Sequence, residues 1–118
     1  NSTQQGKRII AAAFGGDDFT ADFGVFRSDD DRELDFARKQ FALTCHAFGI
    51  ISIDTPYVDY KNLEGLRTEL AFLNSIGMKA KFAIHPTQID IINQAFCPTD
   101  EQVEYYSAMI SEFENAQS

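Results

Sequence analysis

The sequence predicts an α/β fold with parallel strands, and three observations support this prediction. Apolar or β-branched segments recur at residues 8–14, 50–54 and 79–84. A segment with apolar residues at helical spacing comes after each of them. The chain has 118 residues, of which 44% are hydrophobic, and this is enough apolar material for one modest core. Because strands that alternate with helices pair in parallel through right-handed crossovers, we expect one domain over residues 1–118.

The first strand segment, RIIAAAF, runs directly into two glycines and two aspartates. A continuous apolar run is typical of a strand that is buried on both faces. Gly15 and Gly16 allow a tight turn, so Asp17 and Asp18 are expected at the carboxyl end of this strand, where α/β proteins place their chemistry. Neighbouring carboxylates suit a magnesium-like cation that also binds waters and a substrate. Considered by spacing alone, a polar loop or a helix cap is the more common explanation of such a pair.

The rest of the sequence predicts four amphipathic helices, each with a start or stop signal. Residues 19–31 are expected to be a polar stretch, and the run DDDRE at 29–33 a solvated helix entrance. Glycines end the first two helices, a threonine caps the third, and a capping box begins the fourth. The helices and their signals are 34–48 with Gly49, 62–76 with Gly77, 87–97 with Thr87 and Pro98, and 99–113 with Thr99 and Gln102.

Composition excludes several classes of partner. Ten basic and 18 acidic residues give a net charge of -8, which disfavours nucleic acids and anionic membranes. No run approaches the roughly 20 apolar residues that span a bilayer, and the amino terminus NSTQQGKR has no apolar signal core. Cys45 and Cys97 are isolated and are expected to be buried free thiols. We therefore expect a soluble cytoplasmic protein, with the mitochondrial matrix as the alternative.

Several other polar residues have simple structural explanations. Asp54 ends the second strand and is expected to stabilise the turn that follows it, with support of a site at this sheet edge as the alternative. Arg38 and Arg67 lie on predicted helices, where salt bridges with nearby acids are usual. His46 is expected to be a surface or packing residue. His85 lies at the end of the third strand, where a histidine can act as a general base.

Three parallel strands do not make a self-sufficient sheet. Such strands are normally covered on both faces and flanked at both edges by further units. The sequence therefore predicts either a piece of a larger barrel or a sheet that another chain completes.

Three stretches of the chain resemble the carboxyl-terminal part of the citrate lyase beta-subunit-like family, which includes malyl-CoA and citramalyl-CoA lyases and belongs to the HpcH/HpaI aldolase group. These stretches are residues 15–24, 33–69 and 83–103, which begin GGDDF, ELDFA and AIHPT. The resemblance implies a TIM-type (βα)8 barrel. Such a barrel needs about 250 residues, so the chain would supply about three βα units, roughly strands 6 to 8. Other polypeptide, either the missing amino-terminal part or other copies of the protein, would complete it.

The resemblance also implies a site. Asp18 corresponds to a ligand of Mg²⁺, whose second ligand, a glutamate, would lie on other polypeptide. The backbone of Gly16, Asp17 and Asp18 corresponds to the receptor of the substrate carboxylate, and Asp17 stands where relatives usually carry glutamate. His85 and Pro86 correspond to a segment that borders the acyl-CoA pocket. None of the 118 residues is assigned a catalytic role.

The implied chemistry is cleavage or formation of a carbon–carbon bond through an enolate of an acyl-CoA or an oxoacid, with Mg²⁺ as the Lewis acid. Relatives commonly form trimers or hexamers, so a homo-oligomer is expected. The alternative function is a catalytically inactive truncated homologue that acts as a binding or scaffold piece. A two-component receiver domain is a more distant alternative, because its phosphoacceptor site needs five parallel strands.

Overall fold

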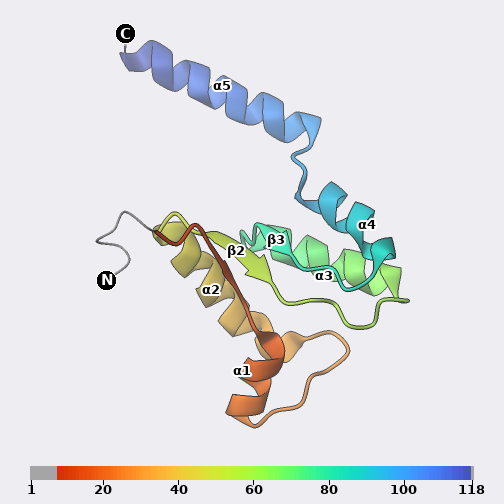
Figure 1. Ribbon diagram of the computed structural model, residues 1–118. Helices are drawn as coiled ribbons and strands as arrows, with labels where there is room; N and C mark the ends of the chain where they lie inside the picture. The colour runs from red at the N-terminus through yellow and green to blue at the C-terminus, as the bar shows by residue number, and fades with distance from the viewer. Residues whose placement is uncertain (1–7, 118) are drawn as a thin grey trace.

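The computed structural model describes residues 8–117 and contains the predicted parallel sheet (Figure 1). The sheet has the order β1-β2-β3, with β1 at Ala11–Ala13, β2 at Ile51–Asp54 and β3 at Ala80–Lys81. The register pairs Ala11 with Ile51 and Ile53 with Ala80. The first and third strands are shorter than the predicted 8–14 and 79–84. The absence of an apolar signal core was predicted from residues 1–8. Residues 1–7 lie outside the described residues.

Helices connect and follow the strands, as the sequence predicted, with one addition. The unpredicted helix is α1, which begins at Gly16 and replaces most of the expected polar stretch. It ends at Gly24, whose φ of 78° is left-handed and lets its amide bond back to Ala21. The helical elements are α1 (Gly16–Phe23), the 3-10 turn η2 (Arg32–Leu34), α2 (Asp35–Ala47), α3 (Leu63–Ser75), α4 (Pro86–Phe96) and α5 (Asp100–Gln117).

Most helix signals were predicted correctly. Gly49 and Gly77 follow α2 and α3 with φ of 67° and 86°, so they end these helices as expected. The structure adds a cap that was not predicted: the Asn62 side chain caps α3 by accepting a hydrogen bond from the Gly65 amide at 2.9 Å. The predicted Thr87 cap is wrong: His85 is the cap of α4, and Thr87 lies inside the first turn. Pro86 occupies the first helical position, where a proline needs no hydrogen-bond acceptor.

The apolar core lies among the helices and the loops beside them. It contains Ala42, Tyr57, Leu66, Leu70, Leu73, Met78 and Ile92. By contrast, the buried side chains of β2 and β3 are polar: Ser52, Asp54 and Lys81. Asp54 and Lys81 pair with side chains of α2 and α3, so a layer of charges lies between the sheet and these helices.

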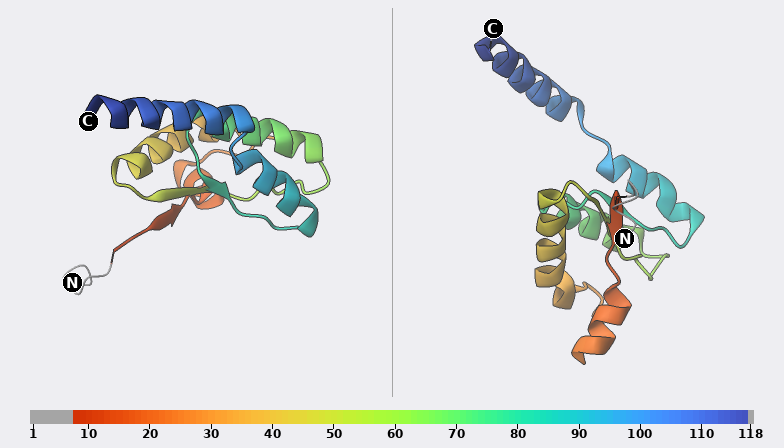
Figure 2. Two further views of the ribbon diagram at one scale, coloured as in Figure 1. Left: turned by 90° about the horizontal axis from the view of Figure 1, so that it is seen from above. Right: turned by 60° about the vertical axis from the view of Figure 1, so that its left-hand side comes forward.

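The other face of the sheet is only partly covered. Residues alternate between faces along a strand, so Ile51 lies opposite to the buried Ser52, and Phe82 lies opposite to Lys81. Ile51 is 50% exposed and Phe82 is 47% exposed. The views in Figure 2 show α2 and α3 on one side of the strands. An apolar sheet face without cover agrees with the prediction that three parallel strands need further protein.

The two cysteines differ. Cys45 on α2 is a buried free thiol, as predicted, and burial raises its pKa. Cys97 is a free thiol but is exposed, so the prediction of its burial is wrong, because it lies in the short connection before α5. Within residues 8–117, no helix combines the length and the hydropathy that a membrane crossing requires.

Candidate functional site

The candidate site begins where β1 ends. The Phe14 amide donates to the carbonyl of Ile53 at 2.8 Å, which extends the parallel pairing to the last residue before the glycines. The chain then turns into α1, and the first bond of this helix runs from the Phe19 amide to the Gly15 carbonyl at 2.9 Å. The amides of Gly16, Asp17 and Asp18 precede this bond, so they have no acceptor within the helix. The turn therefore presents three amide donors at the positive end of a helix.

The turn requires glycine at position 16, because the atoms around this residue leave little room for a side chain. A Cβ atom at Gly16 would lie 3.1 Å from side-chain carbons of both Leu34 and Thr55 and 3.2 Å from a guanidinium nitrogen of Arg27. Thr20, one turn later, is buried and donates its hydroxyl to the Gly16 carbonyl at 3.1 Å. The start of α1 is thus packed closely against the loop after β2 and against η2.

The two aspartates have different surroundings. Asp17 accepts a hydrogen bond from Arg27 Nη1 at 2.6 Å, so its carboxylate is already paired. Asp18 is exposed, and no hydrogen bond or ion pair to its side chain is recorded within residues 8–117. No group of three or more metal-ligating side chains forms within these residues either. Asp18 is therefore one available carboxylate and not a complete metal site.

Arg27 is a residue of this site that sequence reasoning missed. Besides Asp17, it donates from Nε to Asp31 at 2.8 Å and lies 3.7 Å from Glu33. The hydrogen bond and charge of Asp31, together with Asp17, raise the pKa of Arg27 although burial opposes this rise. Arg27 ties the start of α1 to the loop before α2. The only signal in the sequence was a basic residue shortly before the acidic run at 29–31.

The predicted solvated entrance DDDRE is in part buried. Asp31 is 5% exposed and has a positive φ of 53°. Burial raises the pKa of its carboxyl, but hydrogen bonds from Arg27 and Glu69 and the charge of Arg38 lower the pKa overall. The expectation of a solvated run is therefore wrong for Asp31, which connects the site to the charges beneath the sheet.

A buried group of charges lies between β2, β3 and the helices. Arg38 of α2 donates two hydrogen bonds to Asp54, both of 2.9 Å. Lys81 Nζ donates to Asp54 Oδ2 and to the Thr55 carbonyl, both at 2.6 Å. The predicted turn role for Asp54 is therefore wrong: its carboxylate is fully buried and is the centre of an ionic cluster. The predicted salt bridges of Arg38 and Arg67 are both confirmed. The bridge of Arg67 is an exposed ion pair with Glu64.

Glu69 of α3 completes this cluster. Its two oxygens lie 3.2 Å from Arg38 Nη2 and 2.7 Å from Lys81 Nζ, and the second contact is an ion pair without hydrogen-bond geometry. Burial raises the pKa of Glu69, and the Asp31 carboxylate adds to this rise by accepting a hydrogen bond from the protonated form. The cations of Lys81 and Arg38 oppose the rise but do not cancel it.

This raised pKa predicts a pH dependence of stability. The folded chain holds the Glu69 proton more tightly than the unfolded chain does, so the protonated form favours folding. That contribution is complete below about pH 4.3, the ordinary value for glutamate, and is lost as the pH rises through the folded pKa. We expect Glu69→Gln to gain stability relative to the unmodified chain as the pH rises from 4 to 8. Urea denaturation across this range measures the difference, and Glu64→Gln, at an exposed position on the same helix, is the comparison variant.

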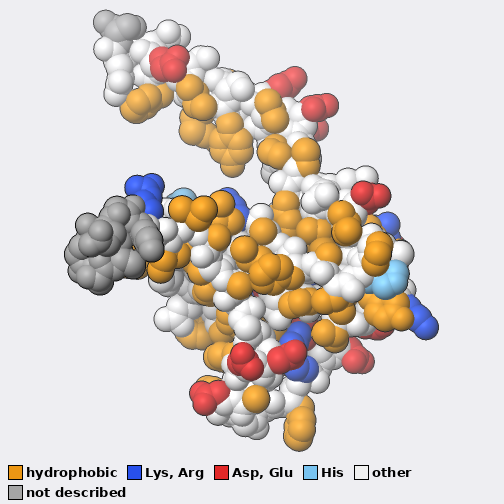
Figure 3. Space-filling view, in the orientation of Figure 1, with side chains coloured by type: hydrophobic (Ala, Val, Ile, Leu, Met, Phe, Trp, Pro, Cys, Tyr) orange, Lys and Arg blue, Asp and Glu red, His pale blue; other side chains and the backbone are white. Residues whose placement is uncertain are grey.

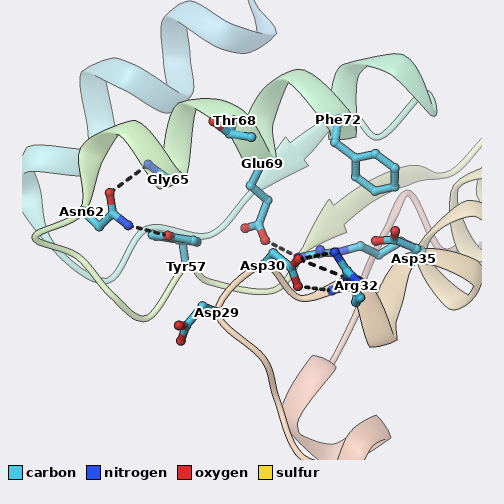
Figure 4. A pocket seen from close by; sticks show the side chains of 11 residues that line it. Asp29, Asp30, Arg32, Asp35, Tyr57, Asn62, Gly65, Thr68, Glu69 and Phe72 are labelled. Carbon is cyan, nitrogen blue, oxygen red and sulfur yellow. Dashed lines mark hydrogen bonds and ion pairs between the residues drawn. The ribbon is translucent and has the colours of Figure 1, made fainter.

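A cavity of about 700 Å³ opens beside the cluster (Figure 4). Its walls come from the entrance to α2 and from α3, and they include Glu69, Tyr57 and Phe72. In Figure 4, Asn62 and Tyr57 are joined by a hydrogen bond in which the Asn62 amide donates to the phenol oxygen at 3.4 Å. None of the predicted site residues lines this cavity. The predicted site is therefore separate from this cavity.

His85 and Pro86 lie at the start of α4, after β3. The His85 ring stacks on Tyr60, with 4.5 Å between ring centroids and 12° between planes. Its Nδ1 lies 2.9 Å from the Thr87 hydroxyl and accepts from the Thr87 amide at 3.3 Å. These contacts fix the histidine as a helix cap and an aromatic surface. His46 is exposed on α2, in agreement with the surface role predicted for it.

The structure places these predicted residues at one edge of the sheet. Gly16, Asp17 and Asp18 follow the carboxyl end of β1, and His85 follows β3. Because the strands are parallel, their carboxyl ends share an edge. No recorded contact within residues 8–117 joins His85 to the aspartates.

Comparisons with known proteins agree with the resemblance. The model of the family HpcH/HpaI aldolase/citrate lyase matches residues 3–86. The chain is 32% identical over 114 residues to the mitochondrial citramalyl-CoA lyase of Mus musculus, which covers 97% of the chain and 34% of that relative. It is 35% identical over 104 residues to the citrate lyase subunit beta of Haemophilus influenzae, with coverage of 88% and 36%. The chain thus spans about a third of the length of these curated relatives.

A solved structure shows the same relation. The crystal structure of RipC from Yersinia pestis superposes with a TM-score of 0.74 and is 35% identical in sequence. The match covers 80% of the chain and 43% of RipC. The α/β fold with its parallel sheet is thus shared with a solved relative. The chain belongs to the HpcH/HpaI aldolase/citrate lyase family.

Proposed function

We propose that the chain is part of a Mg²⁺-dependent carbon–carbon lyase that acts on an acyl-CoA or an oxoacid. The observation that carries this proposal is the turn after β1 in a member of this family. There the Asp18 carboxylate, which has no partner among residues 8–117, lies beside the amides of the first turn of α1, which have no acceptor within the helix. Relatives named as citramalyl-CoA lyase, citrate lyase subunit beta and malyl-CoA lyase support the reaction class. The choice among citryl, malyl and citramalyl substrates depends on residues beyond this turn.

The proposed architecture is the carboxyl-terminal segment of a TIM-type (βα)8 barrel, with residues 1–118 as a partial domain that holds roughly strands 6 to 8. Three features support it: the strands are parallel, they are consecutive in the sheet, and helices cover one face while apolar residues remain on the other. The remaining strands would come from other polypeptide, either the amino-terminal part of the barrel or other copies. By the resemblance, the assembled protein would be a trimer or hexamer.

Asp18 fits one ligand of the metal. Mg²⁺ is usually held by one or two carboxylates together with waters and substrate oxygens. The Asp18 carboxylate forms no ion pair or hydrogen bond with another side chain of residues 8–117, whereas the Asp17 carboxylate already pairs with Arg27. A second carboxylate from other polypeptide would complete the set. When bound, the metal would supply a Lewis acid that stabilises negative charge on the substrate oxygens.

The amides of Gly16, Asp17 and Asp18 fit a receptor for the substrate carboxylate. Amides in the first turn of a helix point along its axis toward a ligand, and the helix dipole favours an anion there. Substitution of the usual glutamate by Asp17 leaves these amides unchanged. The pairing of Asp17 with Arg27 would hold the turn in place while the substrate is bound.

His85 and Pro86 are proposed to border the acyl-CoA. Tyr60 and His85 form a stacked aromatic surface at the edge of the sheet that also holds Asp18. Flat aromatic surfaces suit contact with an adenine ring or with the apolar arm of a thioester. In this arrangement His85 shapes the pocket, because its Nδ1 is engaged with Thr87.

Binding of Mg²⁺ together with oxaloacetate or glyoxylate tests the proposal. We expect Asp18→Asn to weaken Mg²⁺ affinity at least about tenfold, equivalent to 1.4 kcal/mol, in isothermal titration of the chain combined with the barrel part that completes it. Asp22→Asn, one turn later on the exposed surface of α1, is the matched control and should leave the affinity unchanged.

Unchanged Mg²⁺ affinity in the Asp18→Asn variant would contradict the ligand assignment. Absence of any saturable binding in the completed barrel would instead favour the second candidate, a binding or scaffold piece without turnover. The uncovered apolar sheet face is the observation that favours this second candidate.

A further inference from the structure

Arg27 connects a buried acid to an exposed one at the start of α1. Its Nε donates to Asp31 at 2.8 Å, and its Nη1 donates to Asp17 at 2.6 Å. The Asp31 side chain is 7% exposed, whereas the Asp17 side chain is 76% exposed. In Figure 3 acidic and basic side chains lie next to one another over α1, in the lower part of the view. One guanidinium therefore links the surface turn to the interior of the molecule.

The buried end of this link is held from several sides. The Asp31 carboxylate lies 3.8 Å from Arg38 Nη2 and accepts a hydrogen bond from the protonated Glu69. The Asp31 carbonyl accepts a hydrogen bond from the Leu34 amide at 2.9 Å, which fixes its backbone at the start of η2. Because Arg38 and Glu69 belong to the buried ionic cluster, Asp31 gives Arg27 a partner whose position is set by the packed interior.

The exposed end of the link lies against the proposed carboxylate receptor. After α1 the chain folds back, and the Val25 amide donates to the Thr20 carbonyl at 3.0 Å. This return places Arg27 beside the first turn of the same helix. Its Nη1 lies only 3.2 Å from the position that a Cβ atom would take at Gly16. Arg27 therefore contacts the turn both at the Asp17 carboxylate and beside the backbone of Gly16.

The geometry of arginine matters here as much as its charge. An exposed ion pair usually contributes little to stability, because two flexible side chains must be ordered to form it. Asp31 already orders Arg27, so pairing with Asp17 requires little further loss of side-chain freedom. A lysine carries the same charge, but all its donors are on one nitrogen, so it cannot replace donors on two separate nitrogens.

We propose that Arg27 is a positioning residue, which holds the amides of Gly16 and Asp17 in the geometry that receives the substrate carboxylate. This inference rests on the proposed function and adds that the receptor depends on the two-nitrogen link and not on positive charge alone. Asp17 acts through Arg27: its own charge would repel an anionic substrate, but its pairing with Arg27 keeps the turn in place.

Amide hydrogen exchange tests the link without any ligand, in the chain combined with the barrel part that completes it. The Phe19 amide reports on the turn because it donates to the Gly15 carbonyl in the first bond of α1. We expect Arg27→Lys to speed its exchange at least about tenfold relative to that of the Leu70 amide, which lies in the core. Arg32→Lys is the matched control.

Arg32 suits this purpose because it forms an exposed pair with Asp30 at 3.0 Å in the same loop. Its substitution by lysine should leave the ratio of the Phe19 and Leu70 exchange rates unchanged. The same ratio in Arg27→Lys and in the unmodified chain would overturn the proposal, whether or not the assembled protein binds an oxoacid.

Binding of oxaloacetate at saturating Mg²⁺ tests the consequence for the receptor. We expect Arg27→Lys to weaken oxaloacetate affinity at least about tenfold in isothermal titration, although the charge is kept, because small displacements of positioning groups are costly. Asp17→Asn separates position from charge by the sign of its effect. Loss of a nearby negative charge alone would tighten the binding of an anion, whereas we expect weakening of at least about threefold, since the partner of Arg27 is lost.

The conservative variant Asp17→Glu keeps a carboxylate for Arg27 and should retain more oxaloacetate affinity than Asp17→Asn. Unchanged affinity in Arg27→Lys, or tighter binding by Asp17→Asn, would overturn the positioning role. If the unmodified assembly binds no oxaloacetate, the proposed lyase function fails instead, and the exchange of the Phe19 amide alone decides whether Arg27 holds the turn.

Discussion

Asp54→Asn is expected to lower the free energy of unfolding by about 3–5 kcal/mol, the usual effect of removing one partner from a buried charge pair. Asp54 is fully buried and binds Arg38 through two hydrogen bonds and Lys81 through a third. Without its charge, two buried cations lose their closest counter-ion. Urea denaturation monitored by circular dichroism measures the change, and Asp59→Asn, at an exposed position, is the control.

The cluster around Asp54 also explains why the effect should be strongly non-additive. Lys81 has Asp54 and Glu69 as partners at 2.6 and 2.7 Å. Lys81→Met alone is expected to be destabilising because it leaves these acids short of one cation. Added to Asp54→Asn, however, Lys81→Met should cost less than it does alone, since it removes a charge that has already lost its main partner. Equal costs in both backgrounds would contradict the coupling of this pair.

Local features of the fold were predictable because their causes lie within a few residues. The glycine stops at Gly49 and Gly77 and the capping box at Thr99 each depend on backbone geometry that neighbouring residues determine. Helix α1 was missed because its signal is weak: it is short, and two acids in its first turn are equally typical of a loop.

The site was predicted only in part, for a different physical reason. The location of Asp17 and Asp18 after a strand follows from the order of residues along the chain. The pairing of Arg27 with Asp17 and Asp31 depends on how the loop between α1 and η2 folds back. The contacts among Arg38, Asp54 and Lys81 depend on how α2, β2 and β3 pack together in the tertiary structure. Periodicity reports whether a residue faces the core, but it does not report which charged residues meet there.

Gly65→Ala is expected to lower the free energy of unfolding by about 1–3 kcal/mol, the usual cost of overpacking a close contact. A Cβ atom at Gly65 would overlap the hydroxyl of Tyr57 and lie 2.7 Å from the Asn62 amide nitrogen. Tyr57 is 7% exposed and belongs to the apolar core, so its ring has little room to move. Alanine is otherwise the better residue inside a helix by about 1 kcal/mol, so a loss of stability would report the clash directly.

The phenol oxygen of Tyr57 should account for most of this loss. In the background of Tyr57→Phe, which removes this oxygen and keeps the ring, Gly65→Ala should become neutral or stabilising by up to about 1 kcal/mol, because the gain in helix propensity then exceeds the remaining contact with Asn62. Thermal and urea unfolding of the four chains measure this cycle. The same destabilisation in both backgrounds would show that Asn62, and not the Tyr57 hydroxyl, is the reason that position 65 requires glycine.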